Sequence, residues 1–285
     1  MARPDALLPA EDRWPATVAR LRSAGCVYAE EEASLLVAEA DSPDELASMV
    51  DRRVAGDPLE QVLGWAEFCG LRIQVDAGVF VPRRRTELLV REAIAVVGDG
   101  TVAVDLCCGT GAVGAALVAA LPHLELHATD IDLAAVRCAR RNLAAAARKS
   151  SVLAGPRHVV VHQGDLYEPL PATLRGRVDL LVVNAPYVPT DEVSLMPPEA
   201  RLHEPLGALD GGSDGLDVHR RVTVHAPRWL APGGRLLIET SERQAPQAVE
   251  AFASSGLTPH VTRSEELGAT VVVATQGRTG GSRRC

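Results

Sequence analysis

Apolar residues recur at helical spacing through residues 12–57, with charged positions between them. Residues 42–45, Ser-Pro-Asp-Glu, have the form of a capping box with proline in the first turn, which indicates the start of a helix. Gly56 stands where the last of these helices would end. Helices joined by short loops predict a small helical domain over residues 1–58.

The pattern changes over residues 59–81, where short runs of β-forming residues replace the helical spacing. Two such runs, Gln61–Gly64 and Gly70–Val75, lie on either side of residues 65–69. Two short strands with a connection between them predict a β-hairpin, and we expect this hairpin to link two domains.

After residue 81, apolar strands alternate with amphipathic helices. The expected strands are Thr101–Leu106, Leu124–Thr129, His158–His162, Val178–Val183 and Arg235–Glu239, followed by two β runs at Thr258–Thr262 and Thr270–Ala274. The expected helices are Thr86–Val97, Ala112–Leu121, Leu133–Arg148 and Gln244–Ser254. This alternation predicts a doubly wound α/β fold with a parallel sheet over residues 82–276, and residues 277–285 are expected to form a flexible tail.

The composition is that of a globular protein. Hydrophobic residues make up 47% and charged residues 23% of the 285 positions, which excludes a disordered, collagen-like or coiled-coil chain. Thirty-seven acidic against 29 basic residues and an aromatic share of 3% argue against direct nucleic-acid binding by phosphate neutralisation or base stacking. The acidity is concentrated in residues 1–75, where a solvated helical surface is the favoured interpretation and a face for a basic partner the alternative.

Neither a signal peptide nor a membrane segment is expected. Residues 1–14 lack an apolar core, and the longest apolar stretch, Ala112–Leu121, is about half the roughly 20 residues that span a bilayer. We therefore expect a cytoplasmic protein. The six cysteines form no metal-binding spacing and are expected to be reduced, and the eight histidines look scattered, so no metal site is expected.

A glycine-rich turn follows the first strand of the α/β domain. Residues 105–114 read Asp-Leu-Cys-Cys-Gly-Thr-Gly-Ala-Val-Gly, and Asp130 lies 19 residues after Gly111 at the end of the next strand. Gly109, Thr110 and Gly111 let the backbone approach a ligand closely, while the Asp130 carboxylate can accept hydrogen bonds from two ribose hydroxyls. The arrangement predicts a nucleoside-type cofactor. By itself it also fits a dinucleotide, or a turn kept for packing.

Two further carboxylates favour S-adenosylmethionine over a dinucleotide. Asp105, just before the glycine turn, could pair with a cationic amino group of the ligand and would repel a pyrophosphate. Asp165 follows the third strand and could accept a proton from the adenine amino group, with Leu166 against the ring. The alternative for Asp165 is a turn-capping aspartate.

Residues 184–187, Asn-Ala-Pro-Tyr, directly follow the apolar strand 178–183. They are expected at the carboxyl end of a central strand, where ligands bind in open α/β sheets. The side-chain oxygen of Asn184 and the carbonyl of Ala185 can together accept both hydrogens of one planar NH2 group, which Pro186 and Tyr187 would help to enclose. The pattern predicts a site for an amide or an exocyclic amine.

Further motifs lie on both sides of the glycine turn. They are Asp-Pro-Leu-Glu-Gln-Val-Leu-Gly at 57–64, Phe-x-Gly-Leu at 68–71, Val-Phe-Val-Pro-Arg at 79–83, Thr-Glu-Leu-Leu-Val at 86–90, Glu-Pro at 204–205 and Ala-Leu-Asp-Gly-Gly-Ser-Asp-Gly-Leu at 208–216. With these motifs the chain resembles the HemK/PrmC-type protein-(glutamine N5) methyltransferases, which use S-adenosylmethionine to methylate a glutamine of peptide-chain release factors. The similarity runs from about Pro58 to Gly215.

This resemblance implies a class I methyltransferase with a Rossmann-like seven-stranded sheet and a small N-terminal helical domain that helps to recognise a protein substrate. It also implies that residues 109–111, Asp130, Leu166 and Asn184 hold the cofactor, and that residues 184–187 hold the glutamine amide. Catalysis would consist mostly of positioning, because S-adenosylmethionine is already an activated methyl donor.

The sequence departs from the family at several positions. Ala185 replaces the usual first proline after the asparagine, and activity is expected to survive because the chemistry requires only a carbonyl. Residues 82–86, Pro-Arg-Arg-Arg-Thr, lack the usual proline and acid after the first arginine. Residues 195–205 look more like the branch that methylates a ribosomal protein. A release factor is therefore the first candidate substrate and a ribosomal protein the second.

The sequence motifs also leave three rival functions to compare. A nucleic-acid exocyclic-amine methyltransferase would use a similar Asn-x-Pro-Tyr site but lacks support from the charge balance. A non-catalytic cofactor-binding scaffold is disfavoured by the intact Asn184 and Tyr187. A nicotinamide oxidoreductase is disfavoured by Asp105, which would oppose the phosphates.

Overall fold

The structure is a computed structural model that describes residues 10–98, 100–154 and 158–277. Residues 1–9, which belong to the stretch 1–14 where no signal peptide is expected, lie outside the described residues, and so does all of the predicted tail except Gly277. Within the described residues no helix is both long and apolar enough to cross a membrane.

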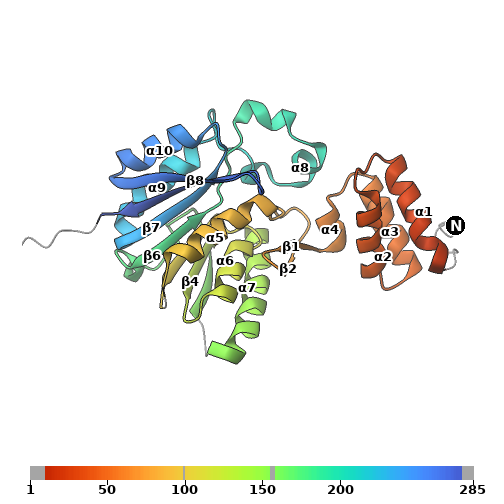
Figure 1. Cartoon of the computed structure of the whole chain (residues 1–285), viewed down its shortest axis with the longest axis horizontal. Coiled ribbons are helices and arrows are strands. Elements are labelled where there is room, and N and C mark those ends of the chain that lie inside the picture. The colour runs from red at the N-terminus through yellow and green to blue at the C-terminus, as the bar shows by residue number, and fades with distance from the viewer. Residues whose placement is uncertain (1–9, 99, 155–157, 278–285) are drawn as a thin grey trace, which may run out of the picture.

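The N-terminal helices form a small domain with its own core. They are α1 (Ala10–Ser23), α2 (Ala29–Glu39), α3 (Pro43–Val54) and the short α4 (Leu59–Leu63). Ser42 caps α3 by accepting a hydrogen bond from the Glu45 N–H, as the capping-box pattern predicts. Leu21, Leu36 and Val50 are fully or almost fully buried between the helices. Figure 1 shows α1, α2 and α3 at one end of the molecule, away from the large sheet.

The linking hairpin exists, but its first strand is shifted from the prediction. Strand β1 (Trp65–Phe68) pairs antiparallel with β2 (Leu71–Gln74), whereas residues 61–63 of the first predicted run, Gln61–Gly64, belong to helix α4. The helix forms because Val62 and Leu63 pack into the core of the N-terminal domain. Gly64 ends it in the left-handed conformation, at φ 78°.

The second domain is built on a seven-stranded sheet of order β5-β4-β3-β6-β7-β9-β8. The strands are β3 (Val102–Leu106), β4 (Glu125–Asp130), β5 (His158–Gln163), β6 (Val178–Val183), β7 (Leu230–Thr240), β8 (Leu257–Ser264) and β9 (Ala269–Gln276). Strands β5, β4, β3, β6 and β7 are parallel, while β9 runs antiparallel to both β7 and β8. The predicted α/β fold is therefore confirmed, with a mixed rather than wholly parallel sheet.

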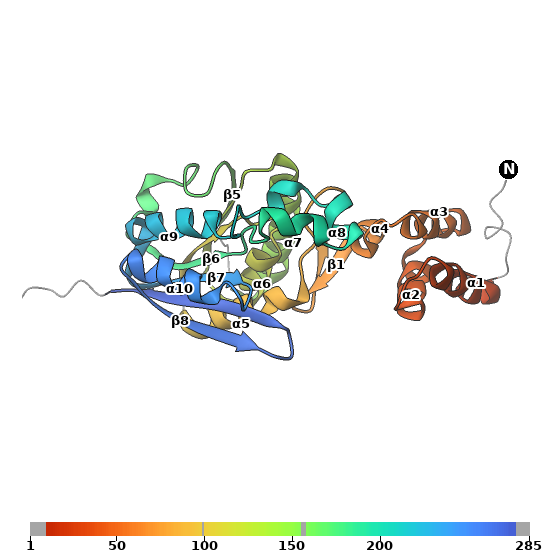
Figure 2. The same cartoon turned by 90° about the horizontal axis from the view of Figure 1, so that it is seen from above.

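Helices cover both faces of this sheet. One core combines the sheet with α5 (Glu87–Val96), α6 (Ala112–Ala120) and α7 (Leu133–Ala154). The other combines it with α9 (Asp217–Trp229) and α10 (Ala245–Ser254), and Figures 1 and 2 show these two helices together. The central strands are almost wholly buried between them, as β3 illustrates with all five residues inside.

Besides α4, two α-helices of the described residues were not predicted from the sequence. One is α8 (Pro198–His203), which lies on the side of the sheet nearest the N-terminal domain (Figures 1 and 2). The other is α9, whose buried positions His219, Val222, Thr223, Ala226 and Trp229 do follow helical spacing. The signal was hidden because two of these inward-facing residues are polar and because Pro227 lies near the end of the helix.

Candidate active site

A cavity of about 640 Å³ opens at the carboxyl ends of the parallel strands. Residues that directly follow β3, β4, β5 and β6 line it, and so do residues from the hairpin region and from the segment 196–209. Ligands of open α/β sheets bind at this edge, where the strand order reverses. The position predicted for the site is therefore the position of the cavity.

The glycine turn contributes one residue to the cavity wall. Gly109 lines the cavity in the left-handed conformation, at φ 53°, and its N–H donates to Asp130 Oδ2 at 2.9 Å. Thr110 is buried, and neither it nor Gly111 is in the cavity wall. Gly111 serves packing instead: a Cβ there would lie 3.0 Å from the Ala139 backbone on α7.

The position of Asp105 corrects the expectation that it faces the ligand. Its side chain is buried beneath the turn, outside the cavity wall, and Oδ2 accepts a hydrogen bond from the Gly114 N–H at 3.1 Å. Burial raises the pKa of this carboxyl to about 7. The observed role of Asp105 is to hold the first turn of α6, and its predicted pairing with an amino group of the ligand is not retained.

Asp130, the residue predicted to bind the ribose, is the last residue of β4. It lines the cavity, and its two carboxylate oxygens accept hydrogen bonds from the N–H groups of Gly109 and Asp132, both at 2.9 Å. These bonds fix the carboxylate while each oxygen keeps capacity for a further donor. Burial raises its pKa.

Asp165 and Leu166 form the next part of the wall. Arg221 of α9 donates to Asp165 Oδ2 at 2.5 Å, an ion pair at the cavity that the sequence did not predict. Leu166 is buried in the left-handed conformation, at φ 48°. Cys107, which also lines the cavity, is in the left-handed conformation too, at φ 57°. Two strained non-glycine residues in one wall are typical of a ligand site.

All four residues of the Asn-Ala-Pro-Tyr segment line the cavity. Asn184 Nδ2 donates to Thr86 Oγ1 at 3.2 Å, and Thr86 is itself almost fully buried. With the amide nitrogen engaged by Thr86, Asn184 Oδ1 remains the acceptor of that side chain. Ala185 is buried, so the departure from the usual proline leaves a small side chain in the core and a backbone carbonyl in the segment that lines the cavity.

A charged pair, formed by Arg85 of the cavity wall and the buried Glu239, holds Tyr187. The tyrosine hydroxyl donates to Glu239 Oε1 at 3.1 Å, and Arg85 Nε donates to the same oxygen at 3.2 Å. Burial, with the negative charge of Glu239, raises the pKa of Tyr187, so the hydroxyl stays protonated and remains a donor. Sequence reasoning missed Glu239 and assigned no role to Arg85.

The segment 211–215 supports the Asn184–Tyr187 loop from outside. A Cβ on Gly211 would lie 2.7 Å from the Pro186 carbonyl, and one on Gly215 would lie 2.3 Å from the Tyr187 carbonyl. Gln244 Nε2 bridges the two segments by donating to the carbonyls of Tyr187 (2.9 Å) and Asp214 (2.8 Å). These glycines are thus required by close backbone packing.

Arg83, which follows the hairpin, is bonded to Glu204 in the part of the cavity wall formed by residues 196–209. It donates to Glu204 Oε1 at 2.6 Å, and the same oxygen accepts the Val81 N–H at 3.1 Å. Burial raises the pKa of Glu204, whereas the nearby Arg83 opposes that shift. Arg83 and Glu204 both belong to motifs found in the sequence, but the sequence did not predict the contact between them.

Comparisons with known proteins agree with this geometry. The chain matches the family model of the methyltransferase small domain over residues 70–202. It is 37% identical over 242 residues to the release factor glutamine methyltransferase of Geobacter sulfurreducens, covering 84% of this chain and 80% of that protein. With the release factor glutamine methyltransferase of Mycolicibacterium smegmatis it shares 36% identity over 269 residues, covering 88% and 92% of the two chains. A solved methyltransferase structure from Pyrococcus furiosus has a TM-score of 0.54 at 16% identity, covering 81% and 99%, a likeness of fold.

The fold and the site define a class I S-adenosylmethionine-dependent methyltransferase. Within this class, the chain belongs to the release factor glutamine methyltransferase family. The fold class and the family predicted from the sequence motifs are thereby confirmed, and the oxidoreductase and scaffold alternatives are set aside. The roles of the individual site residues remain predictions.

Proposed function

We propose that this enzyme transfers the methyl group of S-adenosylmethionine to the side-chain amide nitrogen of a glutamine in a peptide-chain release factor. The observation that carries the proposal is the Asn184 side chain, which lines the cavity while its amide nitrogen is engaged by Thr86. An acceptor oxygen is thus left for an incoming NH2 group. The names of the relatives supply the protein substrate.

The cavity residues fit the cofactor. Asp130 would bind the ribose hydroxyls, Gly109 allows close approach of the backbone, and Leu166 offers an apolar surface for the adenine. Asp165 would accept from the adenine amino group, in competition with Arg221. When bound, S-adenosylmethionine supplies an activated methyl group on a sulfonium.

The residues of the Asn184–Tyr187 loop would position the amide of the substrate glutamine. Asn184 Oδ1 and the Ala185 carbonyl would each accept one hydrogen of the glutamine NH2, while the ring of Tyr187 packs against its flat face. The two oxygens stabilise the positive charge that grows on the nitrogen as its lone pair attacks the methyl group. No general base is assigned, because the proton can leave to water after transfer.

The segment 195–206, part of which lines the cavity, supports a protein substrate. Leu195, Leu202 and Leu206 belong to the segment that includes α8, and each is at least 60% exposed. Three large apolar side chains on one exposed segment favour contact with another protein. This segment is tied to the N-terminal domain, since Arg53 Nη1 donates to Glu199 Oε1 at 2.6 Å.

A ribosomal protein is the second candidate substrate, on the strength of residues 195–205. Direct nucleic-acid binding is not part of the proposal, because the net charge is −8. We propose that the enzyme acts in the cytoplasm, where translation takes place.

The experiment is a methyl-transfer assay with isotopically labelled S-adenosylmethionine. Purified release factor, ribosomal proteins and a DNA duplex are offered in parallel, and the labelled residue is located by mass spectrometry. The proposal requires label on a release-factor glutamine and none after that glutamine is changed to glutamate. Label only on a ribosomal protein would move the substrate to the second candidate, and label only on DNA would refute the amide site.

A further inference from the structure

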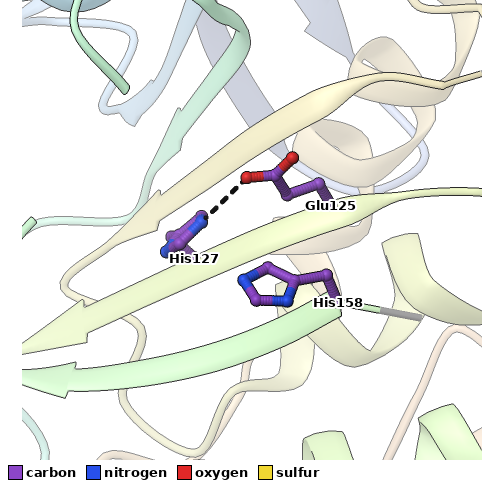
Figure 3. A group of neighbouring side chains, drawn as sticks. All are labelled: Glu125, His127 and His158. Atoms are coloured by element: carbon purple, nitrogen blue, oxygen red, sulfur yellow. Dashed lines mark hydrogen bonds and ion pairs between the residues drawn. The ribbon is translucent and has the colours of Figure 1, made fainter. Parts of the chain in front are cut away.

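Three metal-ligating side chains meet on one face of strands β4 and β5, outside the active-site cavity. The strand register pairs Glu125 with His158, and His127 lies two residues further along β4, on the same face. Figure 3 shows the three side chains gathered over the two strands, with the His158 ring turned towards His127. Glu125 and His158 begin their strands, whereas the predicted cofactor residues follow the opposite ends.

The donor atoms are close enough for one ion. One ligand atom from each residue lies within 4.8 Å of the others, and Glu125 Oε1 is 3.2 Å from His127 Nε2. Zinc bonds of about 2.0 to 2.1 Å at tetrahedral angles separate ligand atoms by roughly 3.3 Å. Glu125 and His127 already have this spacing, and the exposed His158 ring is free to turn through the remaining distance.

A fourth residue orients the central histidine. His127 is only 3% exposed, and its Nδ1 is 3.0 Å from His162 Nε2, with the two rings stacked at 13°. When Nδ1 carries the proton and donates it to His162, the lone pair of Nε2 faces Glu125. Metal-bound histidines usually donate their other N–H to such an acceptor, which fixes the tautomer.

We propose that Glu125, His127 and His158 bind a divalent transition metal of the Zn²⁺ type, with water as the fourth ligand and His162 as the residue that positions His127. Two imidazoles and one carboxylate suit Zn²⁺ and its neighbours, while Ca²⁺ and Mg²⁺ require more oxygen ligands. The ion takes the place of the proton that Glu125 and His127 share. It links the edge strand β5 to β4 and stabilises that edge of the sheet.

Arg177 is the internal competitor for this site. Its Nη2 lies 4.0 Å from Glu125 Oε2, and the side chain is 55% exposed, so it can turn towards solvent when a cation binds. Replacing it should therefore strengthen metal binding. An Arg177→Gln variant is expected to bind Zn²⁺ more tightly than the wild type.

The test is calorimetric titration of the untagged, reduced full-length protein with ZnCl2, and Co²⁺ absorption then reports the ligand type. The wild type should bind one ion per chain without thiolate-to-cobalt absorption. His158→Ala and Glu125→Gln should each weaken binding by at least about tenfold, and His162→Ala by roughly tenfold through loss of orientation. The control is His260→Ala, another exposed histidine on the opposite edge strand, β8.

Binding that is lost in His158→Ala and Glu125→Gln but kept in His260→Ala supports the site. A wild type that binds no ion overturns it. Binding that survives both ligand variants, or that shows thiolate absorption, also overturns it by assigning the metal to other residues.

Discussion

The Asn184 side chain has two ends with different partners, and this determines what it can do. Its nitrogen is held by Thr86, at 3.2 Å, so its oxygen is the end left for a substrate. Thr86 touches neither predicted ligand and is therefore a positioning residue. An amide side chain without this bond could turn over and offer a donor where the glutamine NH2 requires an acceptor.

We predict that Thr86→Val lowers the rate of methyl transfer by about tenfold, because an unpaired buried amide nitrogen costs roughly 1 to 3 kcal/mol and frees the side chain to rotate. The measurement is single-turnover kinetics at saturating cofactor. Thr86→Ser should restore most of the rate, and cofactor affinity should be unchanged in both variants. If Thr86→Ser is as slow as Thr86→Val, the hydroxyl is not what orients Asn184.

At this scale the sequence predicted the part of the cavity wall that lies at the carboxyl ends of the strands. Gly109, Asp130, Leu166 and the Asn184–Tyr187 segment could be found because each directly follows a strand whose end is visible in the sequence. Asp105 could not be placed, because whether a carboxylate at a strand end points outwards or beneath the turn depends on the helix packed against it. Thr86 and Glu239 contact the site from distant parts of the chain, which no local pattern reveals.

At the scale of elements, the catalytic loop depends on a second loop. Residues 211–215 pack so closely against Pro186 and Tyr187 that a Cβ on Gly215 would collide with the Tyr187 carbonyl, and Gly215 itself has φ 77°. The loop at residues 184–187 and the segment 211–215 therefore act as one unit, and Gln244 is hydrogen-bonded to both.

We predict that Gly215→Ala lowers the melting temperature and reduces turnover by at least about tenfold, since the strained backbone and displaced Tyr187 cost on the order of 1 to 3 kcal/mol. Thermal unfolding and methylation rates measure the two effects. The matched control is Gly98→Ala, where a Cβ meets open space without a left-handed backbone. Equal behaviour of the two variants would contradict the packing role of Gly215.

The contact between β3 and α6 makes stability depend on pH. The pKa of Asp105 is raised to about 7 in the folded protein, above its ordinary value of 3.8, so the folded state binds the proton more tightly than the unfolded state does. Stability contributed by this group is therefore present at low pH and is lost as pH rises through about 7.

We predict that Asp105→Asn, whose side-chain oxygen can still accept from Gly114, removes this loss. Between pH 5 and pH 8 the variant should gain about 2 to 3 kcal/mol relative to the wild type. Denaturant unfolding of both proteins at the two pH values gives the difference directly. A constant difference across this range would show that Asp105 does not titrate there.

The bounds of helices and strands were predicted best where a single local pattern of apolar residues determines the element. Apart from β7, which begins at Leu230 rather than Arg235, the strands of the sheet and the helices α5, α6 and α10 lie within a few residues of their predicted bounds, because each has a clear local apolar pattern. The first hairpin strand was misplaced at Gln61–Gly64 because residues 61–63 fit both a short strand and a helical turn, and only contact with the N-terminal core decides between them.

For the whole molecule, the important contact joins the N-terminal domain to the substrate side of the cavity. Arg53 is buried and donates to Glu32 within its own domain and to Glu199 at the start of α8. The N-terminal domain can thus hold the segment that carries the exposed Leu195, Leu202 and Leu206.

We predict that Glu199→Gln raises the KM for the protein substrate several-fold while leaving the Kd for cofactor unchanged, because it weakens the link to Arg53 without touching the cofactor residues. Steady-state kinetics and calorimetry separate the two quantities. Glu192→Gln, which breaks a surface pair with Arg243 on the same segment, is the control and should resemble the wild type. A changed cofactor affinity in Glu199→Gln would speak against a role confined to the substrate.

The central claim is that this cavity holds a glutamine amide through Asn184, and single-turnover methylation by Asn184→Ala tests it most directly. Loss of one preorganised partner of a developing charge should slow transfer by on the order of 100-fold or more. Cofactor affinity, measured by calorimetry on the same preparation, should stay within a few-fold of the wild type. A folded Asn184→Ala enzyme that methylates its release-factor substrate at a near-normal rate would contradict the account.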